Sequence, residues 1–151
     1  MTRIIAAFDS FKGSLTSREA GEAFRRGFMA ERPDAEVEVL AIADGGEGMA
    51  EAISEGVGGV MVSKQVSDPL GRRIEAHYVL INEGDTAVIA MSSASGLTLL
   101  SPDERNPLIA STYGTGELIV DALERGCSNI IMGLGGSATK DCGVGMLRDP
   151  A

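Results

Sequence analysis

The chain has 151 residues and a formal net charge of −9, from 22 acidic and 13 basic residues, which argues against nucleic acids and anionic membranes as partners because both need clustered lysine and arginine. Two cysteines, Cys127 and Cys142, are too few for a disulfide framework, so both are expected as reduced thiols, with Cys142 a small buried residue. No apolar run approaches the roughly 20 residues of a membrane span, and we expect a cytoplasmic protein.

The first part of the chain alternates strands and helices. Residues 3–8 predict a fully buried strand, and residues 36–42 alternate as a second one. Between them, Thr16 and Glu19 have the spacing of a capping box, which predicts a helix over residues 17–30. A second helix is expected over residues 49–55, and this order indicates a βαβα unit.

From Val60 the pattern changes to strands joined by turns. Strands are predicted at residues 60–66, 73–81, 86–91 and 129–132, the last of them buried, with a hairpin turn at residues 82–85. A helix is expected over residues 115–125, ended by Gly126, and another begins at Gly143. His77 is expected as a surface residue. The turn at residues 68–71 suggests a domain boundary, giving domains at residues 1–67 and 68–151.

The glycine-rich stretch at residues 133–143 points to function. An apolar run leads into Gly135 and Gly136 and then into the hydroxyls of Ser137 and Thr139, so backbone amides can approach an anion closely. A tight turn without a ligand is the alternative. Asp141 would place a carboxylate beside a bound phosphate, as a base or a metal ligand, or would only stabilise a helix N-terminus.

Two further loops follow strands in the same way, at residues 9–14 and 43–48. Loops at the carboxyl ends of parallel strands share one edge of the sheet, so the three are expected to converge. Lys12 would reach the β- and γ-phosphates, or is a solvated surface lysine. Asp9 and Asp44 would hold Mg²⁺ or substrate hydroxyls, or cap turns, and Glu47 is expected to be functional.

The candidate site residues fall into three groups. The predicted catalytic residues are Lys12, Asp44 and Asp141, and the predicted metal ligands are Asp44 and Asp141. Secondary contacts are expected from four further positions, Ser95, Gly96, Thr115 and Gly116, together with Glu117, with loop turns and a helix cap as the alternative. The predicted substrate- and phosphate-binding residues, with those four included, are Asp9, Ser10, Gly13, Ser14, Gly45, Gly46, Glu47, Ser95, Gly96, Thr115, Gly116, Gly135, Gly136, Ser137 and Thr139.

The amino-acid sequence of these motifs and their surroundings resembles that of the bacterial glycerate kinases that phosphorylate D-glycerate with ATP. The resemblance extends from Ile4 to about Leu147 and includes DSFKGS at residues 9–14, ADGGEG at 43–48 and GLGGSAT at 133–139. It is also carried by residues 68–72, 94–97, 106–107 and 112–118. The sequence departs from the family pattern at positions 8, 90, 140 and 142, where the family usually has proline, glutamate, asparagine and glycine, in that order. The residues of this chain there are Phe8, Ala90, Lys140 and Cys142.

The resemblance implies an α/β protein with a flavodoxin-like (Rossmann-like) domain into which a second α/β domain is inserted. It implies an ATP-dependent glycerate kinase that transfers the γ-phosphoryl group of Mg-ATP to a hydroxyl of D-glycerate. Because such kinases are much longer, the chain looks like an amino-terminal portion. The alternative is a catalytically inactive truncated fragment or an anion-binding half-domain.

Overall fold

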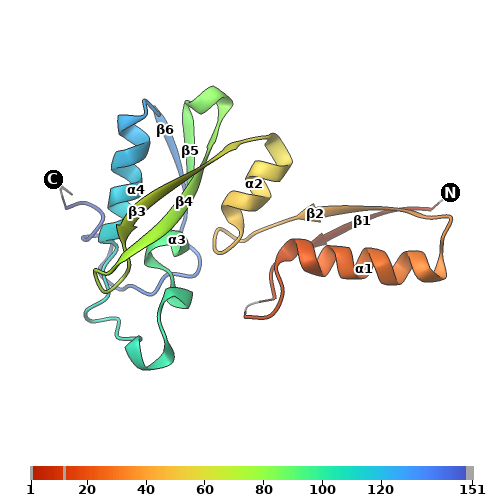
Figure 1. The fold of residues 1–151 in the computed structure, drawn as a ribbon, viewed down its shortest axis with the longest axis horizontal. Coiled ribbons are helices and arrows are strands. Elements are labelled where there is room, and N and C mark those ends of the chain that lie inside the picture. The colour runs from red at the N-terminus through yellow and green to blue at the C-terminus, as the bar shows by residue number, and fades with distance from the viewer. Residues whose placement is uncertain (1, 12, 149–151) are drawn as a thin grey trace. The chain divides into compact units, whose positions relative to one another are not determined.

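The computed structural model describes residues 2–11 and 13–148 as a mixed α/β protein (Figure 1). Its chain forms two compact units, Met1–Asp44 and Gly45–Ala151. In the described part of the chain, no helix has the length and apolar character that crossing a bilayer requires.

The first unit is a parallel strand pair with one helix. Strand β1 (Arg3–Phe8) pairs with β2 (Glu36–Ala41). Helix α1 (Ser17–Glu31) packs against both strands, and the predicted capping box is confirmed: Thr16 N donates to Glu19 Oε2 at 2.8 Å and Glu19 N donates to Thr16 Oγ1 at 3.2 Å. The expectation of a fully buried β1 is wrong, because its side chains alternate between two faces and Ile5 is 61% exposed.

The second unit is built on a four-stranded sheet in the order β3-β4-β5-β6. The sheet strands β3, β4 and β5 are antiparallel, and β6 returns parallel to β5. The turn Asn82–Gly84 (η1) closes the predicted hairpin. The strand bounds are β3 Val60–Ser67, β4 Arg73–Ile81, β5 Thr86–Ala90 and β6 Asn129–Gly133.

Helices lie on both faces of this sheet. Helix α4 (Tyr113–Glu124) packs on the face that carries Tyr78, and α2 (Met49–Val57) packs on the face that carries Val79. Both side chains are fully buried, as expected for neighbouring positions of a strand covered on both sides. The short helix α3 (Ser92–Ser95) and two 3₁₀ turns, Leu97–Leu99 (η2) and Pro102–Glu104 (η3), complete the unit.

Two sequence-based expectations differ from the structure in this unit. Strand β6 is not buried: it is an edge strand in the described sheet, and Ile131 is 46% exposed. Residues 142–147 form turns rather than a helix, because Cys142 and Gly143 have left-handed φ values of 53° and 77°. The turn at residues 68–71 joins β3 to β4 within this unit, and the chain divides into its two compact units after Asp44.

Candidate functional site

The loop after β6 lies against the loop that precedes α2. Gly135 N donates to Gly45 O at 3.0 Å, and a Cβ at Gly133 would lie 2.4 Å from the same oxygen. A Cβ at Gly135 would lie 2.8 Å from Gly46 N, so the two backbones approach more closely than side chains allow. The structure therefore brings together Gly45 and Gly46 with Gly135, from two of the three predicted loops.

The glycine-rich loop presents unused backbone donors. Gly136 O accepts from Leu97 N at 2.8 Å, and Ala138 N donates to Ser95 O at 2.9 Å, which fixes the loop beside α3. The N–H groups of Gly136 and Ser137 donate to no other described residue. The hydroxyls of Ser137 and Thr139 lie 2.9 Å apart. Successive open amides next to hydroxyls form the kind of concavity that binds anions.

The secondary contacts predicted at α3 and α4 lie in the interior. Ser95 and Thr115 are fully buried, and their hydroxyl oxygens are 2.7 Å apart. A Cβ at Gly96 would lie 2.2 Å from Ser92 O, and one at Gly116 would lie 2.7 Å from Met146 O. All four positions thus pack inside the unit beside the loop, and their contacts to a ligand stay a prediction.

Asp141 is held by hydrogen bonds from the polypeptide. Its Oδ2 accepts from the N–H and the hydroxyl of Thr112, both at 2.8 Å, and from Gly145 N at 3.1 Å. Its Oδ1 accepts from Gly143 N at 3.1 Å. Burial raises the pKa of Asp141, but the hydrogen bonds from Thr112, Gly145 and Gly143 outweigh it, and the net pKa is lowered. This set of contacts favours a structural role, because a low pKa makes a weak base.

The turn after Asp141 corrects the expectation for Cys142. Its thiol is free and exposed rather than buried, and its φ of 53° lies in the left-handed region, where glycine is favoured. Cys127 is free and buried, as a reduced thiol is expected to be. A glycine at this position would suit the backbone better than the cysteine does.

The loop predicted at residues 9–14 belongs to the first unit. Asp9 Oδ1 accepts a hydrogen bond from the N–H of the adjacent Ser10 at 2.7 Å, one residue short of the Asx-turn contact that a turn cap would make. Ser14 N donates to Phe11 O at 2.8 Å, and Gly13 has a φ of 75° in this tight turn. Lys12 lies outside the described residues. Asp44, the last residue of this unit, is exposed.

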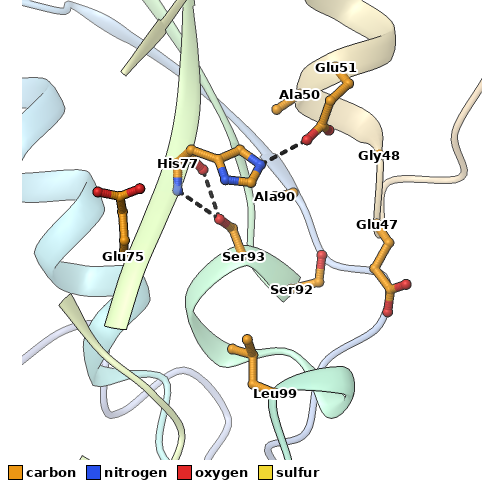
Figure 2. Close-up of a pocket in the computed structure, with 10 residues that line it drawn as sticks. All are labelled: Glu47, Gly48, Ala50, Glu51, Glu75, His77, Ala90, Ser92, Ser93 and Leu99. Atoms are coloured by element: carbon orange, nitrogen blue, oxygen red, sulfur yellow. Dashed lines mark hydrogen bonds and ion pairs between the residues drawn. The ribbon is translucent and has the colours of Figure 1, made fainter. Parts of the chain in front are cut away.

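A cavity of about 300 Å³ opens beside the glycine-rich loop in the second unit (Figure 2). A Cβ at Gly136 would lie 3.3 Å from Ser92 Cβ and 3.9 Å from Glu47 Oε1, and both of these residues line the cavity. The lining residues are Glu47, Gly48, Ala50, Glu51, Glu75, His77, Ala90, Ser92, Ser93 and Leu99.

Comparison with known proteins identifies the family. Residues 4–149 match the glycerate kinase family. The chain belongs to this family. It is 47% identical over 146 residues to the glycerate kinase of Bacillus subtilis (strain 168). The aligned region covers 97% of this chain and 38% of that protein. It is 44% identical over 146 residues to the glycerate 2-kinase of Escherichia coli (strain K12), again with 97% of this chain and 38% of the relative covered.

A solved structure in the family has the same fold. The putative glycerate kinase 2 of Salmonella typhimurium LT2 superposes with a TM-score of 0.74 at 46% sequence identity, over 96% of this chain and 39% of that one. The chain thus spans less than two fifths of the length of these family members.

Sequence reasoning missed one polar pair, formed by His77 and Glu51. His77 Nε2 lies 2.9 Å from Glu51 Oε1 at the wall of the cavity (Figure 2). This hydrogen bond raises the pKa of His77 and lowers that of Glu51. The alternation of β4 placed His77 on one face of the sheet, but only the packing of α2 on β4 brings Glu51 there. Nothing in the sequence spacing indicates the pair.

Proposed function

We propose that the complete gene product is an ATP-dependent glycerate kinase, which transfers the γ-phosphoryl group of ATP to a hydroxyl of D-glycerate. The observation that carries this proposal is the glycine-rich loop, in which the N–H groups of Gly136 and Ser137 stay open beside two hydroxyls. Membership of the glycerate kinase family across residues 4–149 supports the same reaction.

The chain's own groups suit phosphoryl transfer, in which catalysis consists mainly of positioning and charge stabilisation. The Gly136 and Ser137 amides would orient phosphate oxygens, and Lys12 would add a mobile positive charge. Asp9, Ser10, Gly13 and Ser14 are proposed to contribute from the same loop as Lys12. Glu47 Oε1 lies 3.9 Å from the position that a Cβ of Gly136 would take, at the glycine-rich loop.

We include Mg²⁺ in the proposal only as an ion that binds together with the phosphates of ATP. Within residues 2–11 and 13–148, no three side chains of histidine, cysteine, aspartate or glutamate lie close enough together to hold a metal ion. Mg²⁺ at nucleotide sites commonly uses one or two carboxylates together with phosphate oxygens, and Asp44 is proposed as one of these carboxylates. The bound ion would neutralise phosphate charge. Asp141, with its four hydrogen bonds, fits the role of such a carboxylate less well.

The domain type, the domain limits and the cellular location are proposed together with the activity. The parallel pair β1 and β2 with α1 between them suits the first part of a flavodoxin-like domain, which a second α/β domain would interrupt. Domain limits at residues 1–67 and 68–151, a cytoplasmic location and the absence of nucleic acid or membrane partners remain predictions.

The test is a coupled assay of ADP formation by the complete gene product, with and without D-glycerate. Turnover that depends on D-glycerate is expected, and Lys12→Ala should lower it by on the order of 10²-fold or more with little change in melting temperature. Arg32→Ala, which removes an exposed charge at the end of α1, is the control. Absence of D-glycerate-dependent turnover would overturn the proposal.

A further inference from the structure

One wall residue of the cavity has an unused polar group. Ser92 is 5% exposed, and its hydroxyl has no hydrogen-bond partner among the described residues (Figure 2). In the same part of the chain, no fully enclosed side-chain oxygen or nitrogen lacks a partner, so the Ser92 hydroxyl must border open space. The neighbouring Ser93 is different, because its hydroxyl donates to His77 O and accepts from His77 N, both at 2.9 Å. Ser92 is thus free to bind a ligand.

The charges on the wall select against an anion in the cavity. Glu47, Glu51 and Glu75 line it, whereas no lysine or arginine is among the described lining residues. His77 supplies the one titratable nitrogen base, and its Nε2 is already paired with Glu51. A phosphate or carboxylate inside would be repelled, but a neutral molecule with O–H and N–H donors would find several acceptors.

The spacing of the acids also argues against a metal ion. No group of three such side chains in the described ranges is tight enough to hold one. The acceptors are instead spread around about 300 Å³, the lower end of the range for small-molecule pockets. Ala50, Ala90 and Leu99 add apolar surface between them, so the walls suit a ligand of mixed character that is larger than glycerate.

The edge of the cavity adjoins the candidate anion-binding loop. Ser92 Cβ and Glu47 Oε1 lie 3.3 Å and 3.9 Å from the position that a Cβ of Gly136 would take. The open N–H group of Gly136 is next in the chain to that of Ser137. A ligand that reaches from the cavity to this loop needs a neutral, donor-rich end and an anionic end. A nucleotide has both, with ribose and base at one end and phosphates at the other.

We propose that this cavity holds the nucleoside half of the nucleotide substrate, with a ribose or base donor at Ser92 and the phosphates at the amides of Gly136 and Ser137. This assignment rests on the proposed kinase function and adds the place where the nucleotide is recognised. Glycerate then binds elsewhere in the protein.

The experiment is titration calorimetry on the complete gene product, with ATP, adenosine and inorganic triphosphate as separate probes. Ser92→Ala removes the hydroxyl without adding bulk, and Ala90→Leu fills the cavity from β5. Loss of one hydrogen bond should weaken ATP and adenosine binding by roughly threefold to tenfold in Ser92→Ala. Ala90→Leu should weaken both further, while triphosphate binding stays unchanged in both variants.

Ser101→Ala, at the start of η3 and outside the cavity, is the matched control and should bind all three probes as the wild type does. Melting temperatures show whether each variant is folded. If Ala90→Leu does not fold, the binding data for Ser92→Ala decide the test by themselves. Equal loss of triphosphate binding, unchanged adenosine binding, or a raised KM for D-glycerate with an unchanged KM for ATP would overturn the assignment. Glycerate-dependent turnover in the wild type separates these results from failure of the proposed function.

Discussion

The carboxylate of Asp141 stabilises the turn at residues 142–147, in which Gly143 has a left-handed φ of 77°. Thr112, at the start of α4, and Gly145, in the turn, both donate to its Oδ2, so the side chain ties two segments that are far apart in the sequence. The position of Asp141 after the glycine-rich loop suggested a base or metal ligand. Its partners could not be predicted, because they depend on where α4 begins in space.

We expect Asp141→Asn to change stability more than turnover. The amide can keep the three bonds at Oδ2 only by turning its NH₂ group toward Gly143 N, which loses one acceptor. The free energy of unfolding should fall by about 1.5–3 kcal/mol, the range for the loss of a hydrogen bond to a charged group. Denaturant unfolding and the D-glycerate-dependent rate would be measured on the same protein. A rate reduced to background in a protein of normal stability would instead place Asp141 in the mechanism.

Between elements, a charged network joins α4 to two strands of the sheet. Asp121 of α4 accepts from Lys64 of β3 at 2.7 Å, from Tyr78 of β4 at 2.8 Å and from Arg125 at 2.8 Å. Burial raises the pKa of Asp121, but these three donors outweigh it and lower the pKa to about 2. The ionised carboxylate therefore helps to hold the helix on the sheet.

This network predicts a specific loss of stability in acid. Because the folded pKa of Asp121 lies below the unfolded value of 3.8, its contribution is complete above that value and is lost as the pH falls toward 2. The contribution is on the order of 2 kcal/mol. Asp121→Asn should flatten the free energy of unfolding between about pH 4 and pH 2. Asp103→Asn, an exposed position in η3, should retain the wild-type slope, and an Asp121→Asn profile parallel to the wild type would refute the role of this network.

The elements themselves were largely predictable, and their burial was not. The capping box at Thr16 and the turn at Asn82–Gly84 are local signals, which the sequence contains in full. The burial of β1 and β6 depends on which elements cover them, and the apolar residues Ile5 and Ile131 do not reveal that. The His77–Glu51 pair is likewise a product of packing between α2 and β4.

At the scale of the whole molecule, the two compact units differ in how well their sheets are covered. In the first unit Ile5 and Leu40 are 61% and 43% exposed, although both belong to the strand pair. In the second unit Tyr78 and Val88, on the central strands β4 and β5, are fully buried. A two-stranded sheet is marginal without further cover, so the first unit should open more easily.

Hydrogen exchange under native conditions measures this difference. We expect the amides that join β1 to β2 to exchange at least about tenfold faster than those that join β4 to β5, after correction for intrinsic rates. The amides of the antiparallel pair β3 and β4 serve as a reference within the second unit. Equal protection of both sheets would show that the two units open as one.

The left-handed backbone at Cys142 has a consequence for how this sequence can change over generations. A non-glycine residue in that conformation costs about 1–2 kcal/mol, and glycine avoids this cost because it has no Cβ. A cysteine codon becomes a glycine codon by exchange of its first base alone. The chain is therefore one point mutation away from a more relaxed turn beside its glycine-rich loop, and Cys142→Gly is the substitution that a selection for stability should recover there first.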